Sequence, residues 1–179
     1  MLSRFSILVT LSIGLAVLGG CSSAYDVQSS GGASTQASIP STSSVFVAVP
    51  ADGRFGKTLY SGSGSMTAQA LVTALSSVVK SVRSSNNQVD RVAGMAEAKR
   101  AGFTHYAEPI ILLWEDRATE WSGKRDRVVI RISVLNTVTG KLVDATTIQG
   151  TSKWATLGGD HPQDLLPVPM RRYVAQLVR

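Results

Sequence analysis

The sequence predicts an α/β domain (α+β-like) with a single mixed sheet, in the element order β-α-(β)-α-β-β-β-α. Three observations support this prediction. First, short runs of β-branched residues indicate strands. Second, apolar residues spaced three and four apart indicate helices. Third, both kinds of segment occur together within residues 44–179, as in a domain that combines helices with a sheet. Because paired helices stand between an early strand and a late meander, we expect the helices to pack on one or both faces of the sheet.

The first half of the domain is expected to begin with a strand and a helix. Residues 44–49 are apolar and β-branched and precede Pro50, which is typical of a buried strand. The glycine-rich residues 51–64 predict a loop that carries no phosphate-binding motif. Residues 66–82 predict a helix with a single apolar stripe. That stripe consists of Leu71, Leu75, Val78, Val79 and Val82.

A second helix is predicted over residues 91–101. It follows a helix-ending segment at 84–87 and a very short strand or turn at 88–90. Asp90 can cap its start, and Gly102 stands where a helix commonly ends in the left-handed conformation. Its buried face is expected to carry Val92, Met95 and Ala96.

The second half is expected to form three antiparallel strands. Residues 103–115 predict a long strand in which Pro109 marks an edge or a bulge, because proline cannot donate a ladder hydrogen bond. Residues 127–135 give the clearest strand, and alternation places Ile130 and Ile132 on its core face. Residues 136–140 predict a hairpin turn, and 141–154 the returning strand, with a bulge around 144–148.

The chain is expected to end in a helix. After a loop at 155–162 and a helical turn at 163–166, residues 169–178 predict a last helix. Its expected core face carries Met170, Val174, Leu177 and Val178.

The first 21 residues have the pattern of a secretory signal that ends at a cysteine. Arg4 gives a positive start, and residues 5–17 form an uncharged apolar region shorter than the roughly 20 residues of a membrane-spanning helix. Small residues follow, and then Cys21, the single cysteine of the chain. The alternatives are an ordinary secretory signal with a coincidental cysteine and a cytoplasmic protein with an apolar first helix.

The segment Leu18-Gly19-Gly20-Cys21 resembles the lipobox of bacterial lipoproteins. The resemblance implies that residues 1–20 are a signal peptide and that Cys21 carries diacylglycerol and a further acyl group such as palmitate. It also implies attachment to a membrane, since two or three acyl chains give stable anchoring. Because Ser22 rather than Asp follows the cysteine, the sorting rule of Gram-negative lipoproteins implies the outer membrane. We therefore expect a periplasmic domain.

Composition limits the remaining possibilities. Residues 22–43 are rich in Ser, Thr, Gly and Ala and lack apolar periodicity, so residues 21–43 are expected to form the lipidated cysteine and a flexible linker before the domain at 44–179. Removal of residues 1–20 lowers the net charge from +6 to +5, because Arg4 is the one charged residue removed. Anionic lipid head groups and cell-wall polymers are then the expected charged neighbours, and no nucleic acid is expected.

The candidate catalytic and metal-binding residues form no recognised motif. His105 and His161, with Asp160 or Glu108, are the one conceivable metal set, but their spacing matches no known pattern. A carboxylate pair for glycan hydrolysis would have to come from Glu108, Glu115, Asp116 and Glu120. No nucleophile motif surrounds any serine. We expect no metal, no cofactor and no catalytic site, with His105 hydrogen-bonded in a strand and His161 in a loop.

The segment from Trp114 to Arg127 is the most distinctive surface candidate. It places Trp121 among Arg117, Lys124 and Arg125, and exposed Trp and Arg are enriched at binding hot spots. These four residues are the predicted partner-binding site. The alternative is that Trp121 packs against the sheet while the charges solvate an edge.

Three segments together resemble a family of proteobacterial lipoproteins that carries a domain-of-unknown-function name. They are residues 96–106, the strand end at 114–117 and residues 134–143. More distantly, the pattern is similar to the α/β domains of CsgG, LpoB and the amino-terminal part of TolB. The resemblance implies a protein that binds other proteins in the envelope, as an accessory or scaffold. The alternatives are an enzyme acting on a cell-wall or surface polymer and a structural subunit of a homo-oligomer.

Overall fold

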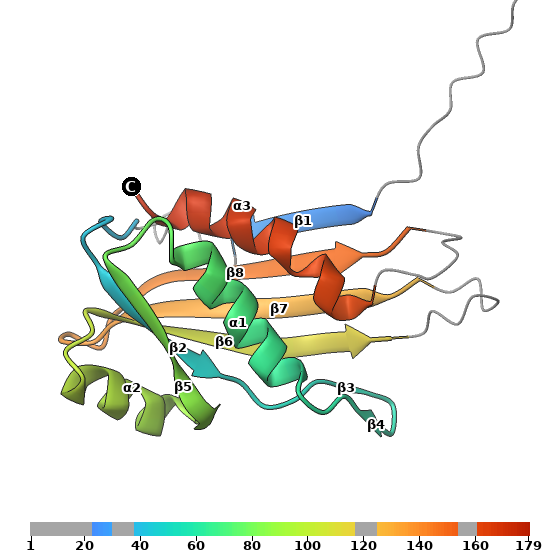
Figure 1. The fold of residues 1–179 in the computed structure, drawn as a ribbon, viewed down its shortest axis with the longest axis horizontal. Helices are drawn as coiled ribbons and strands as arrows, with labels where there is room; N and C mark the ends of the chain where they lie inside the picture. Colours follow the sequence, from blue (N-terminus) through green and yellow to red (C-terminus); the bar gives the residue numbers. More distant parts are fainter. Residues whose placement is uncertain (1–22, 30–37, 117–124, 154–160) are drawn as a thin grey trace, which may run out of the picture.

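A computed structural model describes residues 23–29, 38–116, 125–153 and 161–179. Six strands form one mixed sheet, in the spatial order β1-β8-β7-β6-β2-β5, which confirms the predicted fold class (Figure 1). The strands are β1 (Ala24–Ser29), β2 (Ser44–Val49), β5 (Ser81–Gln88), β6 (His105–Glu115), β7 (Arg127–Asn136) and β8 (Leu142–Thr151). The pairs from β1 to β6 are antiparallel, whereas β2 runs parallel to both β6 and β5.

Three α-helices cover parts of the two faces of the sheet. Helices α1 (Ser63–Leu75) and α3 (Pro167–Leu177) lie side by side on one face, and α2 (Arg91–Arg100) packs against β2 and β6. A small hairpin of β3 (Arg54–Phe55) and β4 (Thr58–Leu59) precedes α1, and a 3₁₀ turn, η1 (Pro162–Leu165), precedes α3. No helix in the described ranges is both long and apolar enough to cross a membrane.

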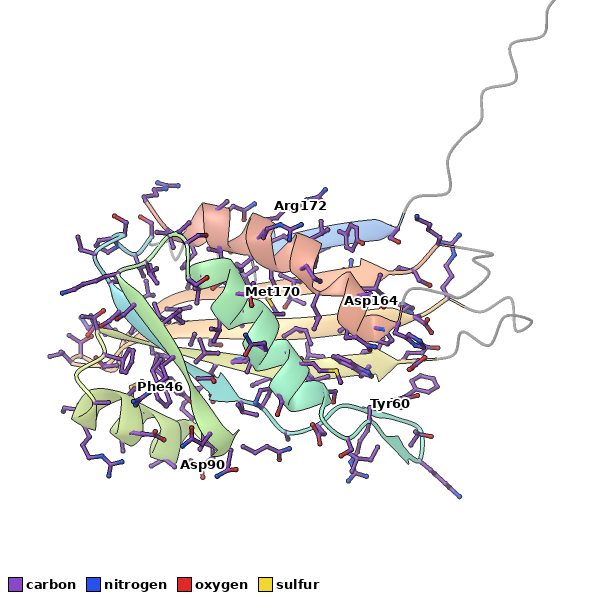
Figure 2. The ribbon with its side chains drawn as sticks, in the orientation of Figure 1. Phe46, Tyr60, Asp90, Asp164, Met170 and Arg172 are labelled. Carbon is purple, nitrogen blue, oxygen red and sulfur yellow. The ribbon has the colours of Figure 1, made fainter. Side chains whose placement is uncertain are left out.

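The larger core lies between the sheet and helices α1 and α3. Ile130 and Ile132 of β7 are 0% exposed there, as the alternation of that strand predicted. Met170 of α3 (Figure 2) is buried in this core together with Val174 and Leu177, which confirms three of the four predicted core residues of the last helix, whereas Val178 lies after the helix and is partly buried. Tyr173 of the same helix is also buried.

A second, smaller core lies under α2. It contains Phe46, which Figure 2 shows between α2 and the sheet, together with Tyr106 and Ala98. The predicted buried face of α2 is wrong in part, because Val92 is 81% exposed and Ala96 is exposed, while Gly94 and Ala98 are buried. The reason is the large Tyr106 ring beneath the helix, against which only small residues fit.

The predicted ends of α2 are confirmed. The Asp90 side chain accepts a hydrogen bond from the Ala93 backbone N–H at 2.8 Å. Gly102 adopts a φ of 76°, and the N–H groups of Gly102 and Phe103 donate to the carbonyls of Lys99 and Ala98. This pattern of hydrogen bonds ends a helix and needs the left-handed conformation that glycine adopts at little cost.

The helix predicted over residues 66–82 is too long. Helix α1 ends at Leu75, and residues 81–88 form strand β5, which pairs in parallel with β2. Val82 therefore belongs to the sheet, where it lies opposite Val45. The sequence of β5 is polar because β5 is an edge strand, so pairing with β2 rather than an apolar pattern determines its conformation.

The flexible linker predicted over residues 22–43 does not extend over Ala24–Ser29, which the structure places in the sheet. This strand, β1, pairs with β8 along its whole length, and Arg172 of α3 lies over the ring of Tyr25 at 5.9 Å. Ile39 is also buried, and its backbone pairs with Val178. The folded domain therefore begins well before residue 44, because backbone pairing holds a segment that shows little apolar periodicity.

The irregularities of the meander lie near their predicted places. Strand β6 pairs with β2 only as far as Ala107, so Pro109 stands on a locally free edge, and the β6–β7 register shifts between Ile111 and Leu113. The hairpin turn ends at Gly140, which has a φ of 68°. The register of β8 shifts between Leu142 and Asp144, slightly earlier than the predicted bulge.

Candidate functional site

The predicted lipidation site and most of the predicted partner-binding residues lie outside the described residues. Cys21 precedes the described part of the chain, as do the rest of residues 1–22. Arg117, Trp121 and Lys124 fall within 117–124. Arg125 is described and exposed, and it stands two residues before β7.

The two histidines lie at opposite ends of the sheet. His105 begins β6 and pairs with Asn136 near the β7–β8 turn. His161 precedes η1, and its Nδ1 lies 3.4 Å from Asp116 Oδ1, just beyond the other end of β6. Since β6 spans 11 residues, the histidines stand about 30 Å apart and cannot hold one metal ion. Asp160 lies outside the described residues.

Each described histidine and carboxylate of the predicted sets has a local partner. The Arg91 guanidinium forms an ion pair with Glu108. Thr104 Oγ1 lies 2.9 Å from His105 Nδ1, as expected of a hydrogen-bonded strand histidine, and burial lowers the pKa of His105. Glu115 is buried, and Glu120 lies outside the described residues. Glu108 stands seven residues before Glu115 on β6, roughly 23 Å away, so it is too distant to form a catalytic carboxylate pair with Glu115 or Asp116.

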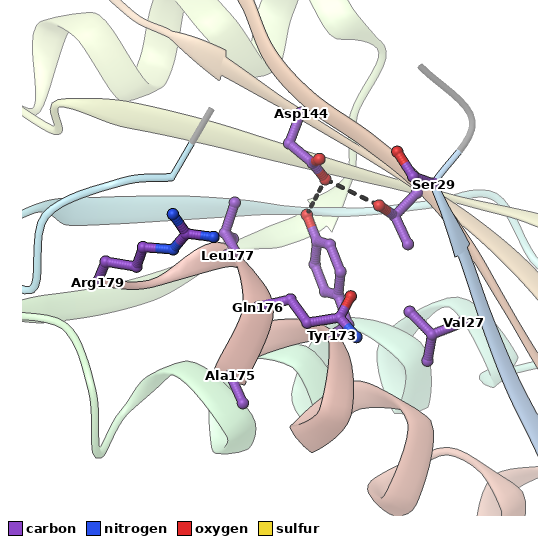
Figure 3. Close-up of a pocket in the computed structure, with 9 residues that line it drawn as sticks. Val27, Ser29, Asp144, Tyr173, Ala175, Gln176, Leu177 and Arg179 are labelled. Atoms are coloured by element: carbon purple, nitrogen blue, oxygen red, sulfur yellow. Dashed lines mark hydrogen bonds between the residues drawn. The ribbon is translucent and has the colours of Figure 1, made fainter. Parts of the chain in front are cut away.

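A different place in the fold gathers buried polar groups. A cavity of about 490 Å³ opens between β1, β8 and the last turns of α3 (Figure 3). Its polar lining residues are Ser29, Asp144, Thr146, Tyr173, Gln176 and Arg179. We call it the Asp144 pocket.

Two hydroxyl groups hold the Asp144 carboxylate in place. Tyr173 Oη and Thr146 Oγ1 each donate to Asp144 Oδ2 at 3.0 Å, and Asp144 is only 5% exposed. Burial, and next the negative charge of Asp144, raise the pKa of Tyr173 well above its ordinary value. The tyrosine is therefore a hydrogen-bond donor and not a base, and the pocket presents a fixed acceptor to a polar group.

The sequence predicts Asp144 only as part of an imperfect strand alternation and does not predict the Asp144 pocket. Asp144 and Thr146 point to the same face of β8 as the core residue Ile148. An acidic residue four positions before the inward-facing Ile148, and therefore on the same face of the strand, was the available signal. Nothing in the sequence pairs it with Tyr173, which is 29 residues away on another element.

The face of the sheet opposite α1 and α3 carries a second candidate surface. In the described part of the chain, no helix packs on this face over most of β7, β8 and β1. Ile110, Leu113 and Val129 are half-buried there, and strand pairing places Leu113 opposite Val129 and Ile110 opposite Arg131. We call these four residues the open-face strip.

The comparison with family models covers most of the domain. Residues 37–177 match a model described as "Domain of unknown function (DUF4823)". The chain belongs to the DUF4823 family. This confirms the expected membership of a domain-of-unknown-function family, whereas the more distant similarity to CsgG, LpoB and TolB stays a prediction.

Among solved structures, PelC shows the same fold as this DUF4823 domain. A PelC dodecamer from Paraburkholderia phytofirmans is 12% identical, with a TM-score of 0.63 over 88% of this chain and 99% of that one. Lipoprotein GNA1162 from Neisseria meningitidis is 11% identical, with a TM-score of 0.42 over 75% of this chain and 96% of that one. No curated protein matches the chain in sequence.

Proposed function

We propose that this DUF4823 protein is a lipoprotein of the outer membrane, attached through Cys21, whose periplasmic domain binds a protein partner as an accessory or scaffold of an envelope assembly. The open-face strip is the observation that carries the binding role. A sheet face that no helix covers leaves apolar side chains accessible to solvent, and such surfaces commonly serve as interaction sites. The anchor is supported by the lipobox-like segment that ends at Cys21.

The chemistry of the open-face strip suits a protein surface. Its apolar side chains lie beside the exposed guanidinium of Arg131 and the half-buried amide of Gln149. An apolar centre with a polar, positively charged border is the usual composition of a non-obligate interface. The strip is also rigid, because β7 is hydrogen-bonded on both sides.

A second candidate function is that of a subunit in a homo-oligomer. The PelC structure with the same fold is a dodecamer. In the described chain, β1 and β5 are the two edges of the six-stranded sheet, and an edge strand can pair with another chain. Under this alternative the open-face strip contacts a second copy.

Site-specific photocrosslinking in intact cells tests the proposal. A photoreactive amino acid replaces Arg131 on the open face, and in a control protein it replaces Gln69, an exposed residue of α1 on the opposite side. We expect a crosslinked product from position 131 and a much weaker one from position 69. A product that contains a different protein supports the accessory role, and one that contains two copies of this chain supports the homo-oligomer. Absence of any product at position 131 would contradict binding through the open-face strip, whether to a partner or to a second copy.

The residues Arg117, Trp121, Lys124 and Arg125 stay a proposed partner-binding set. Replacing Trp121 by Ala should lower the yield of the crosslinked product without lowering the melting temperature, if Trp121 contacts the partner. A large loss of thermal stability would instead show that Trp121 packs within the domain. Arg125→Glu provides the matched charge test, since Arg125 is exposed.

A further inference from the structure

The start of strand β1 fixes which end of the domain lies near the lipid anchor. β1 begins at Ala24, three residues after Cys21. Three Cα–Cα steps span at most about 11 Å, so an anchored Cys21 holds Ala24 close to the bilayer surface. Because β1 pairs with β8 over six residues, the proposed anchor stands three residues before a paired strand of the sheet.

Several other elements meet at the same end of the sheet. The row across the sheet at this end joins Ala24, Thr151, Arg127 and Glu115. At the same end, the β3–β4 hairpin packs beside β6, and η1 contacts β7 and β8 (Figure 1). The Tyr60 hydroxyl, next to the hairpin, donates to the backbone carbonyl of Asp116 just beyond β6. We call this the anchor end.

Among the described residues of the anchor end, the exposed charges are mainly positive. Apart from Arg125, which belongs to the proposed partner-binding set, its described exposed basic residues are Arg54, Lys57, Arg127 and Lys153. The nearby carboxylates are less available: Glu115 and Asp126 are buried, and Asp116 lies beside His161. The carboxylate of Asp164, although exposed, accepts a hydrogen bond from the His161 backbone N–H.

The β3–β4 hairpin adds apolar area to this positive surface. Leu59 is 48% exposed beside Arg54, its partner across the hairpin. Gly56, with a φ of 57°, allows the tight turn that projects Lys57 outward. A short element that combines exposed leucine and basic side chains suits the interface between water and lipid head groups.

We infer that the anchor end is a docking surface for anionic phospholipid head groups, so that the domain stands on the membrane with its strands directed away from the bilayer. This inference rests on the proposed lipid anchor. Basic side chains near a negatively charged leaflet are attracted within about a Debye length, roughly 8–10 Å, and the short connection to Cys21 keeps the Ala24 end of the sheet on the membrane side. The open-face strip then points sideways, toward neighbouring proteins on the same membrane.

Charge alone does not select this end, because the far end of the sheet also carries exposed Lys80, Lys99 and Lys141. The connection to Cys21 does select it, since the far end lies about 30 Å away along the 10 residues of β8. The far end therefore supplies matched control positions.

Fluorescence quenching in vesicles tests the orientation. Lipidated protein has its single natural cysteine occupied, so Thr58→Cys at the anchor end or Val138→Cys at the far-end turn supplies the one free thiol for a fluorophore. Each labelled protein is reconstituted into phosphatidylethanolamine vesicles, with and without phosphatidylglycerol, that contain a nitroxide on the lipid head group. We expect strong quenching at position 58 in anionic vesicles and little at position 138. Equal quenching at both positions would overturn the orientation.

Charge-reversal variants test the recognition of head groups. Replacing Arg54, Lys57 and Lys153 by Glu should lower quenching at position 58 by about twofold or more, as raised salt should in the parent. Replacing Lys80, Lys99 and Lys141 by Glu changes the net charge equally and should have no effect. Equal losses from the two sets, or equal quenching in neutral vesicles, would overturn docking. If intact mass shows that the protein carries no lipid, and the protein does not float with vesicles, the proposed anchor is overturned instead.

Discussion

The hydrogen bond from Tyr173 to Asp144 joins the last helix to strand β8 and provides the sharpest test of the Asp144 pocket. Tyr173 is 1% exposed, and its hydroxyl lies 3.0 Å from Asp144 Oδ2. Tyr173→Phe removes a hydrogen bond to a carboxylate and leaves the ring in place. We expect the free energy of unfolding to fall by about 2 kcal/mol, which corresponds to a melting temperature lower by roughly 4–8 °C.

A double-mutant cycle separates this bond from general damage to the pocket. Asp144→Asn keeps the shape of the acceptor but removes its charge, and the double variant combines both changes. Because the two side chains contact each other, the double variant should lose about 1–2 kcal/mol less than the sum of the single losses. Denaturant unfolding of the four proteins measures this difference. Additive losses would refute the coupling, and Thr146→Val, which removes the other donor to Oδ2, serves as a comparison.

Three further predictions concern the core and its titration. Ile132→Ala should lower the free energy of unfolding by about 2–5 kcal/mol in a denaturant titration, and an unchanged midpoint would show that the faces of β7 are reversed. Gly94→Ala should cost about 1–3 kcal/mol, because the added Cβ would lie 2.6 Å from the Tyr106 hydroxyl; a melting temperature equal to that of the parent would contradict this close packing. Burial raises the pKa of Tyr173 above its ordinary value of 10.0, so as the pH rises the unfolded chain loses the tyrosine proton before the folded chain does. The free energy of unfolding should therefore keep its full value below about pH 10 and fall above it. In Tyr173→Phe protein the free energy of unfolding should fall less above about pH 10 than in the parent. An equal fall in both proteins would contradict this prediction.

The elements that the sequence predicted well are those with their own local signals. The apolar alternation of β7, the Asp90 cap and the glycine after α2 each depend on residues that lie next to one another in the chain. The apolar side of α3 likewise follows from a helical period. In such segments the buried surface and the backbone conformation are determined by the same few residues.

The edge strands could not be predicted in this way. β5 is mostly polar and β1 is half polar, since each has a neighbour on one side only and much of its surface meets solvent. What holds them is backbone pairing with β8 and β2, which are distant in sequence. Local composition therefore indicated a linker for β1 and the end of a helix for β5.

The candidate sites show the same limit. The packing of α2 depends on Tyr106, which lies on another element and leaves room only for Gly94 and Ala98. The Asp144 pocket depends on β8 and α3 meeting beside β1. Both contacts are tertiary, so a pattern within one segment does not reveal them.

The mass of the amino-terminal peptide of protein purified from membranes tests the central claim most directly, because the anchor, the binding role at the membrane and the orientation all depend on Cys21. We predict that residues 1–20 are absent and that Cys21 carries diacylglycerol and an amide-linked acyl chain. Cys21→Ser protein should lack this modification and leave the membrane fraction or persist as precursor. A mature chain with an unmodified Cys21, or one that begins at another residue, would contradict the account.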